Sequence, residues 1–385
     1  DETRSAPFVG VGMVSGAVFT DFDADGDPDL ALALEWGAVR VFQNDGGRFT
    51  DATERLGLAA LTGRWNGITA GDLDEDGRPD LVVTGWGDNL ELRAPYALFY
   101  GDLNRDGLMD VVEGAPDPSG WRPIRGRDAL ARPTLDAVPG LPSLMGVSYE
   151  SFATSTLDTH IGTLGGAPRL EVAELRHMVL LNRGAAFEAR PLPREAQRAP
   201  AFGVALGDLT GDGHEDLLLT QNFYAGRPGV PRYDAGRSLL LEGDGEGGFA
   251  PTPGQESGFL VYGDGRGVAL ADYDRDGRVD VAVGVNGGQT RLFHNTGATV
   301  GLRVILAGSA QNPGAVGASI RIEYADGTFG PSREVRSGEG YWSRNESVQT
   351  LGLAQTPRAV HIVWPSGARS VVAVPEGATE VRGVP

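Results

Sequence analysis

One short acidic pattern recurs along this chain and restricts its fold more than any other feature. It spans nine residues, with aspartate at the first, third, fifth and ninth positions and glycine at the sixth. Full copies begin at Asp21, Asp72 and Asp272, and looser copies begin at Asp102 and Asp208. Runs of apolar, β-type residues such as 16–20 and 30–34 flank the copies. Each copy is therefore predicted to be the turn of a β-hairpin.

Further short strands are expected after each hairpin, for example at 39–44 and 239–244. Four strands per unit, repeated along the chain, is typical of the blades of a β-propeller. The 58 glycines and 24 prolines also favour an all-β protein with many turns. First strands are expected near Gly16, Gly67, Gly203 and Gly267, and a degenerate one is expected at 147–156. The sequence itself shows five or six blades.

The copy at Asp102 follows the copy at Asp72 too closely for a complete blade to lie between them. It is expected in the hairpin between a third strand at 96–100 and a fourth strand at 108–112 of the same blade. Residues 115–146, rich in proline and arginine, are then an irregular insertion or a divergent blade.

These repeats resemble the FG-GAP and VCBS repeats of integrin-α-like propellers over residues 13–299. The C-terminal part resembles the ASPIC/UnbV domain. The stretches that carry this second resemblance are 314–318, 333–341, 351–353 and 363–367. The resemblance implies an all-β protein with a seven-bladed integrin-like β-propeller over 1–299, followed by a small β-sandwich-like domain over 300–385.

The acidic loops are predicted to bind calcium, which takes six to eight oxygen ligands and needs neither cysteine nor histidine. In the first loop the ligands are the side chains of Asp21, Asp23 and Asp25, the carbonyl of Asp27, and Asp29. The corresponding residues in the other loops are Asp72, Asp74, Asp76, Arg78, Asp80, Asp102, Asn104, Asp106, Leu108, Asp110, Asp208, Thr210, Asp212, His214, Asp216, Asp272, Asp274, Asp276, Arg278 and Asp280. We expect about five structural Ca²⁺ ions. The two looser loops should bind more weakly, because Asn104 and Thr210 replace a carboxylate.

The composition narrows the partners of the chain. Its formal charge of -19 should repel nucleic acid and anionic membrane surfaces. No cysteine is present, so disulfides and zinc–thiolate sites are excluded. No apolar run approaches the roughly 18 residues of a membrane helix. We expect an extracellular or periplasmic protein whose signal peptide has been removed. The oligomeric state stays open.

Strand direction predicts where a ligand should bind. In an antiparallel blade, the acidic hairpins lie at one face of the disc, and the loops from second to third strands lie at the opposite face. Aromatic, arginine and amide side chains gather in those loops and suit a carbohydrate, a peptide or another small organic ligand. The predicted ligand-binding residues are Trp36, Arg64, Trp65, Asn66, Trp86, Asn222, Tyr224 and Arg266. They are expected to surround one central funnel.

Two other functions compete with ligand binding. The chain shows no established catalytic motif. It could still be a lyase, isomerase or cyclase with acid–base groups in the funnel, where His160 could pair with Asp158. The long segments 115–146 and 223–236 keep this alternative open, because such loops are often functional lids. The third possibility is a scaffold with no ligand.

Overall fold

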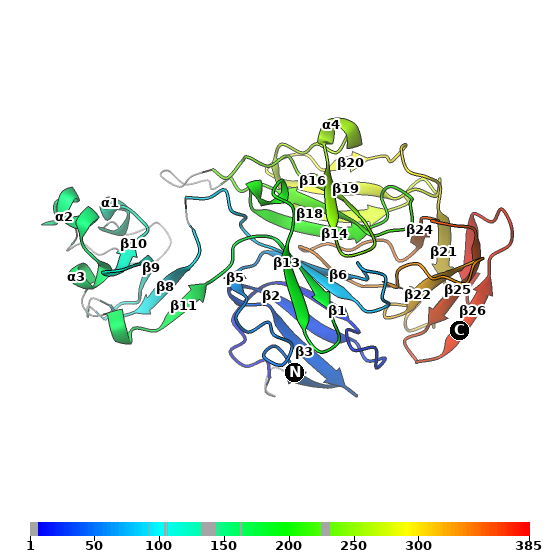
Figure 1. Ribbon diagram of the computed structural model, residues 1–385, viewed down its shortest axis with the longest axis horizontal. Coiled ribbons are helices and arrows are strands. Elements are labelled where there is room, and N and C mark those ends of the chain that lie inside the picture. The colour runs from blue at the N-terminus through cyan, green and yellow to red at the C-terminus, as the bar shows by residue number, and fades with distance from the viewer. Residues whose placement is uncertain are drawn as a thin grey trace.

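The computed structural model describes residues 7–385, apart from 92, 104, 106, 132–143, 145, 162–163 and 225–231. It is an all-β structure (Figure 1), as predicted. Four short α-helices are described, α1 (Arg127–Ala131), α2 (Tyr149–Thr154), α3 (Leu157–Ile161) and α4 (Gly254–Ser257). In the described ranges no helix has the length and apolar character that crossing a membrane requires.

Four antiparallel sheets each contain an acidic loop between their first and second strands. The first blade consists of β1 (Met13–Thr20), β2 (Asp29–Ala38), β3 (Arg40–Asp45) and β4 (Arg48–Asp51), and β5 (Thr62–Arg64) pairs with the end of β2. The second consists of β6 (Gly67–Gly71), β7 (Asp80–Thr84), β12 (Met178–Asn182) and β13 (Phe187–Pro191). The third consists of β14 (Ala201–Gly207), β15 (Asp216–Gln221), β16 (Leu239–Gly243) and β17 (Phe249–Thr252). The fourth consists of β18 (Asp264–Ala271), β19 (Asp280–Asn286) and β20 (Arg291–Phe293).

The blades pack face to face through their apolar side chains. One buried cluster joins the first and second blades, as Val18 and Ile68 illustrate. Equivalent clusters join the second to the third and the third to the fourth. Among the described residues no cluster joins the fourth blade to the first, so the blades form an arc of four. The resemblance implies seven blades, and the sequence itself indicates five or six. The described residues form four blades of this kind.

The Asp102 loop belongs to a separate sheet, which corrects the expectation that it completes the second blade. The inserted sheet has the order β10 (Gly120–Pro123), β9 (Asp110–Asp117), β8 (Tyr96–Gly101) and β11 (Arg169–Val172). It leaves the second blade after β7, and the third strand of that blade is β12, which pairs with β7. Residues 115–131 contain strands and α1, and the expected degenerate strand at 147–156 contains α2. The acidic motif specifies only a local hairpin, and the same local sequence forms whether the hairpin belongs to a blade or to a separate sheet.

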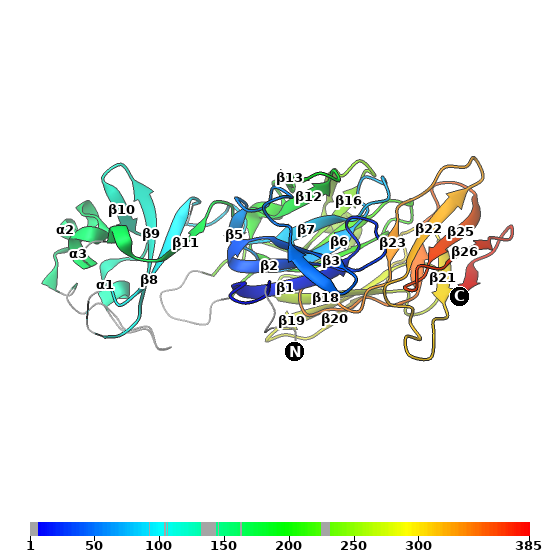
Figure 2. The same cartoon turned by 90° about the horizontal axis from the view of Figure 1, so that it is seen from below.

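The C-terminal domain is a β-sandwich. One sheet contains β24 (Gln349–Leu351), β21 (Leu302–Leu306) and β27 (Glu380–Gly383). The other contains β23 (Arg333–Glu334), β22 (Ser319–Tyr324), β25 (Pro357–Val363) and β26 (Arg369–Ala373). The two sheets enclose one core that includes Val304, Ile320 and Trp364. Figures 1 and 2 show the C-terminal domain and the inserted sheet at opposite ends of the blade arc.

A long hairpin from the C-terminal domain lies along the first strands of the blades. We call residues 334–346 the central hairpin; Glu339 bridges Ser343 near its tip. On the outgoing arm, the amide of Gly340 donates to the Ile68 carbonyl at 2.8 Å. On the return arm, the amide of Leu270 donates to Asn345 Oδ1 at 2.9 Å. The orange trace in Figure 1 shows this segment reaching from the C-terminal domain towards the inserted sheet.

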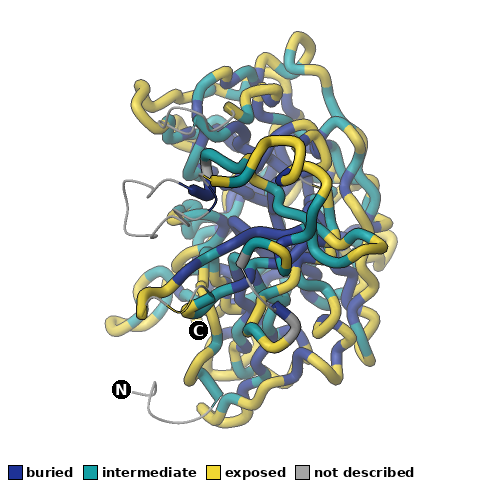
Figure 3. The backbone as a smooth tube through the Cα atoms, turned by 90° about the vertical axis from the view of Figure 1, so that its left-hand side faces the viewer, coloured by how far each residue is buried: buried dark blue, intermediate teal, exposed yellow. Residues whose placement is uncertain are grey.

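The distribution of burial follows this arrangement. Figure 3, seen from the side of the inserted sheet, shows the buried segments inside the molecule and the exposed ones around its rim. All five residues of β6 and all five of β7 are buried, because a blade lies on each side of them and the central hairpin lies along β6.

Candidate metal centres

The five acidic loops share one backbone conformation. The sixth residue has a positive φ in each loop, at Gly26 (99°), Gly77 (89°), Gly107 (87°), Gly213 (103°) and Gly277 (84°). The fourth residue is also left-handed, at Ala24 (61°), Glu75 (58°), Arg105 (62°), Gly211 (75°) and Arg275 (64°). In every loop the sixth amide donates to the first aspartate. Non-glycine residues tolerate this conformation at a cost of about 1–2 kcal/mol, so the loop shape is imposed by its contacts.

The ninth aspartate anchors each full loop to its blade. Asp29 accepts hydrogen bonds from the amides of Phe22 (3.0 Å) and Asn44 (2.7 Å). Asp80 and Asp280 make the same pair of contacts with their own loops and third strands. Burial raises the pKa of Asp29 and of Asp80 to about 7. This position therefore fixes the loop at the end of the third strand, in addition to its predicted place among the ligands.

Carboxylates converge in the three full loops. Ligand atoms lie within 4.8 Å of one another in the groups Asp21–Asp23–Asp25, Asp72–Asp74–Asp80 and Asp272–Asp274–Asp280. Burial raises the pKa of Asp21 to about 6 and that of Asp72 to about 7, because the charged forms lose hydration there. Asp74 Oδ1 is buried without a hydrogen-bond partner. Since all the donors are oxygen atoms and one buried oxygen lacks a partner, these groups fit a hard cation such as Ca²⁺.

The two looser loops differ from the full ones. In the Asp102 loop, the predicted ligands Asn104 and Asp106 lie outside the described residues. In the Asp208 loop, a guanidinium of the C-terminal domain approaches the carboxylates: Arg333 Nη2 lies 3.8 Å from Asp208 Oδ2, and Arg333 Nε lies 2.6 Å from Glu215 Oε1. The protein thus supplies its own positive charge beside the loop that has lost a carboxylate to Thr210.

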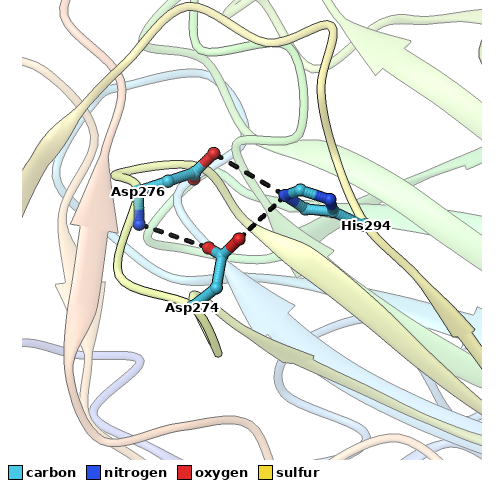
Figure 4. Close-up of side chains that lie close together, drawn as sticks. All are labelled: Asp274, Asp276 and His294. Atoms are coloured by element: carbon cyan, nitrogen blue, oxygen red, sulfur yellow. Dashed lines mark hydrogen bonds and ion pairs between the residues drawn. The ribbon is translucent and has the colours of Figure 1, made fainter.

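The aspartate at the third position of each full loop also contacts a polar residue at the end of the third strand of its blade. Gln43 donates to Asp23 at 2.5 Å, and Arg183 pairs with Asp74. In the last loop, His294 Nε2 lies 2.9 Å from Asp274 Oδ2 and 3.8 Å from Asp276 Oδ2 (Figure 4). Gln43, Arg183 and His294 were not among the residues predicted from the sequence. Their position in the sequence could have identified them, because each is adjacent to an asparagine. The backbone amides of these asparagines, Asn44, Asn182 and Asn295, donate to the aspartate at the ninth position of the loop.

On the far face, opposite the acidic loops, three of the predicted ligand residues come together. The Arg64 guanidinium lies 4.1 Å from the ring centroid of Trp86 and 5.1 Å from that of Trp36. Arg64 also pairs with Glu35. Tyr96 of the inserted sheet packs edge-on against Trp36, and the two indoles are only 8% and 9% exposed. The inserted sheet therefore covers an aromatic cluster that was expected to be open.

The other predicted residues lie elsewhere. Trp65 is fully buried between the first two blades. The side-chain amide of Asn66 donates to the backbone carbonyls of Gly85 and Ala201. The side-chain amide of Asn222 donates to the carbonyls of Gly236 and Gly263. These contacts tie loops together at the blade junctions.

Tyr224 stacks with Arg232 and donates to the Tyr262 carbonyl. Arg266 lies over Phe202 and pairs with Asp264. The eight residues therefore do not surround one funnel. Strand direction predicts at which face of the molecule a loop lies, but it does not predict which other segments cover the side chains of that loop.

Two further polar features lie outside the acidic loops and the aromatic cluster. His160 contacts Ser155, whereas Asp158 Oδ1 accepts from the amide of Leu164, so the expected pair does not form. A cavity of about 70 Å³ lies between the blades and the C-terminal domain, lined in part by Glu215, Arg336 and Glu339. Burial raises the pKa of Glu339, which accepts a hydrogen bond from Thr69.

Comparisons with known proteins agree with the two predicted modules. Residues 21–83 match the FG-GAP-like repeat, and residues 308–382 match the ASPIC and UnbV family. Mouse cartilage acidic protein 1 is 26% identical over 299 residues, which cover 72% of this chain and 41% of the mouse protein. The human protein is 25% identical over 299 residues, covering 72% and 40%. The chain thus spans about two fifths of the length of these relatives.

Among solved structures, a crystal structure of BBS1N in complex with ARL6DN, soaked with lead, covers 96% of this chain and 94% of that chain at 10% identity. Its TM-score is 0.24, too low to bear on the fold.

Proposed function

We propose that this chain, which combines an FG-GAP-like repeat with an ASPIC and UnbV domain, is an exported, calcium-stabilised binding scaffold. The observation that carries the proposal is the convergence of carboxylates in three loops of one shape, with the buried Asp74 Oδ1 lacking a partner. Side chains of the first, third, fifth and ninth aspartates would hold each ion, and the carbonyl of the seventh residue would complete the set. A bound Ca²⁺ supplies the positive charge that offsets the mutual repulsion of these carboxylates.

We assign the ions to the Asp21, Asp72 and Asp272 loops. The Asp208 loop is a weaker candidate than these, because Thr210 replaces a carboxylate and provides no charge. The Asp102 loop has Asn104 in place of a carboxylate. The combination of an FG-GAP-like repeat with an ASPIC and UnbV domain supports an exported protein.

Counting the bound metal tests this assignment. Metal-stripped protein would be dialysed against a low-micromolar and then a millimolar Ca²⁺ concentration, and its calcium content measured by atomic emission. We expect three ions per chain at the lower concentration. Uptake of the remaining ions, if any, should need the higher one. A chain that retains no calcium at millimolar concentration contradicts the proposal.

The ligand of the scaffold is proposed to bind on the far face. A carbohydrate, a peptide or another small organic molecule suits the part of that face around Tyr224, where the exposed Arg232 guanidinium lies 4.0 Å from the centroid of the Tyr224 ring and combines a cation with a flat apolar surface. Arg232→Ala should weaken retardation of the protein by soluble polysaccharides in affinity electrophoresis, with Arg358→Ala on the C-terminal domain as the control. His160 and Asp158 make separate contacts, so the acid–base pair named for the lyase, isomerase or cyclase alternative does not form.

A further inference from the structure

The C-terminal domain docks directly on the loops to which we assign calcium. Glu334 Oε1 accepts from the amide of Asp21 at 3.0 Å. The amide of Ser332 donates to Asp72 Oδ2 at 2.7 Å. Asp272 is contacted twice, by Arg303 Nε at 2.8 Å from Oδ2 and by Glu346, which accepts from its amide at 3.2 Å. All three loops therefore present their first aspartate to the same domain.

The first aspartate also determines the shape of its own loop. Both oxygens of Asp72 accept from the amide of Gly77, and Asp272 Oδ2 accepts from that of Gly277. In the Asp72 and Asp272 loops, one carboxylate thus holds the turn, would bind the ion and contacts the C-terminal domain. Without a cation, neighbouring carboxylates repel one another, and the surface on which the domain docks loses its geometry.

The central hairpin carries this docking through to the far face. Arg336 donates to the Ala70 carbonyl at 2.7 Å, and Glu339 accepts from Thr69 at 2.8 Å. Gly340 has φ 64°, and a Cβ placed on it would lie 2.3 Å from the Val204 carbonyl oxygen. At the tip, Tyr341 packs against Phe202 at the start of β14. The hairpin therefore spans the blades from the acidic loops to the far face.

The tip presents an unusually exposed side chain. Trp342 is 91% exposed, and its φ of 51° is a left-handed conformation that bulky residues rarely adopt. Its ring stacks on Tyr341 with centroids 6.0 Å apart. Strained, exposed residues on a well-supported backbone are often functional. Here the support comes from backbone groups of the second and fourth blades, which hydrogen-bond to the hairpin, and from the Phe202 ring of the third blade.

We propose that calcium binding at the acidic loops and seating of the central hairpin are thermodynamically linked, so that metal controls the display of Tyr341 and Trp342 on the far face. The inference rests on the proposed calcium binding. Linkage is reciprocal: if the ions favour the seated hairpin, then the seated hairpin must raise the affinity for the ions by the same factor. A substitution at the tip of the hairpin should therefore lower the calcium affinity of acidic loops that the substituted residue does not contact.

Gly340→Val tests this reciprocity, because the added side chain meets the Val204 carbonyl and Gly340 contacts none of the acidic loops. Gly338→Ala is the matched control in the same hairpin, since its nearest neighbour would be the Ser343 carbonyl at 3.8 Å. Calcium affinity would be measured by competition with a fluorescent chelator. We expect Gly340→Val to bind Ca²⁺ about tenfold more weakly than wild type, a typical coupling, and Gly338→Ala to match wild type.

Hydrogen exchange of the wild-type protein provides the reverse measurement and needs no variant. Amides of residues 336–346 should exchange faster after metal removal and regain protection with Ca²⁺, whereas buried amides of β6 stay protected. This second measurement decides the matter if Gly340→Val does not fold. Wild-type affinity in a folded Gly340→Val, or hairpin exchange that ignores calcium, overturns the linkage but leaves calcium binding intact. A wild-type protein that binds no calcium instead overturns the proposed function.

Discussion

Single buried polar side chains hold the junctions between blades. His177 is fully buried; its Nδ1 accepts from the amide of Gly85 at 2.9 Å, and its Nε2 donates to the Ala199 carbonyl at 3.1 Å. This pattern fixes the neutral tautomer with the proton on Nε2. Burial lowers the pKa of His177 to about 4, because a buried imidazolium would lose its hydration. The junction of the second and third blades is therefore sensitive to acid.

His177→Gln tests this sensitivity, because the glutamine amide can accept and donate without titrating. Below pH 6.5 an unfolded histidine takes up a proton that the buried one refuses until about pH 4. The wild-type free energy of unfolding should thus fall by about 3 kcal/mol over this range through this residue alone. Urea unfolding of metal-stripped protein at pH 7 and pH 4.5 should show that acidification favours the variant over wild type by this amount, because carboxylates with raised pKa values, such as Asp29 and Asp80, contribute equally to both proteins.

Asp74→Ala removes the ligand whose buried oxygen lacks a partner. We expect the variant to bind one calcium ion fewer than wild type, with a lower melting temperature in Ca²⁺. A site at a hundredfold excess of ligand over its dissociation constant stabilises the fold by about 2.7 kcal/mol, and that contribution disappears. Asp326→Ala, an exposed aspartate of the C-terminal domain away from the acidic loops, should keep the full metal content. Equal calcium content in the two variants contradicts the assignment of the Asp72 loop.

At the level of elements, the sequence predicted what is local. The acidic hairpins, their flanking strands and the alternation of β22 and β25 depend on neighbouring residues, so they could be read directly. The partner of β7 could not, because β12 returns only after the whole inserted sheet. The same limit applies to Trp36 and Trp86: their face was predicted, but the strands that cover them come from elsewhere in the chain. Trp65, adjacent to Arg64, points into the core instead.

Arg333 joins an element of one domain to a loop of the other. Its side chain and that of Glu215 are 8% and 5% exposed. Arg333→Met leaves the Glu215 carboxylate buried without its partner, which should cost about 3–5 kcal/mol of stability. The double variant Arg333→Met/Glu215→Gln should recover much of this loss. Chemical denaturation of the two single variants and the double variant measures the coupling, and additive effects would show that the pair does not interact.

For the whole molecule, calcium should decide whether the fold survives at ordinary temperature. Three sites at a hundredfold excess of metal over their dissociation constants stabilise by about 8 kcal/mol in total, which is comparable to the entire stability of a typical domain. Scanning calorimetry of metal-stripped protein should show a much lower melting temperature, restored by Ca²⁺ and only weakly by Mg²⁺, which prefers smaller octahedral sites. An unchanged melt after verified metal removal would falsify the stabilising role.

The central hairpin also sets an order of events during synthesis. The four blades emerge from the ribosome before the residues that fill the space between them, and domains generally fold as they emerge. Hairpin residues 340–343 pass so close to the first strands that a Cβ placed on Gly16 or Gly267 would lie 2.7–3.3 Å from hairpin atoms, a contact that exists only once these residues have been made. Because the arc is open between its first and last blades, the hairpin can enter from the side without threading. A nascent chain stalled before residue 334 would therefore hold folded blades around a vacant centre.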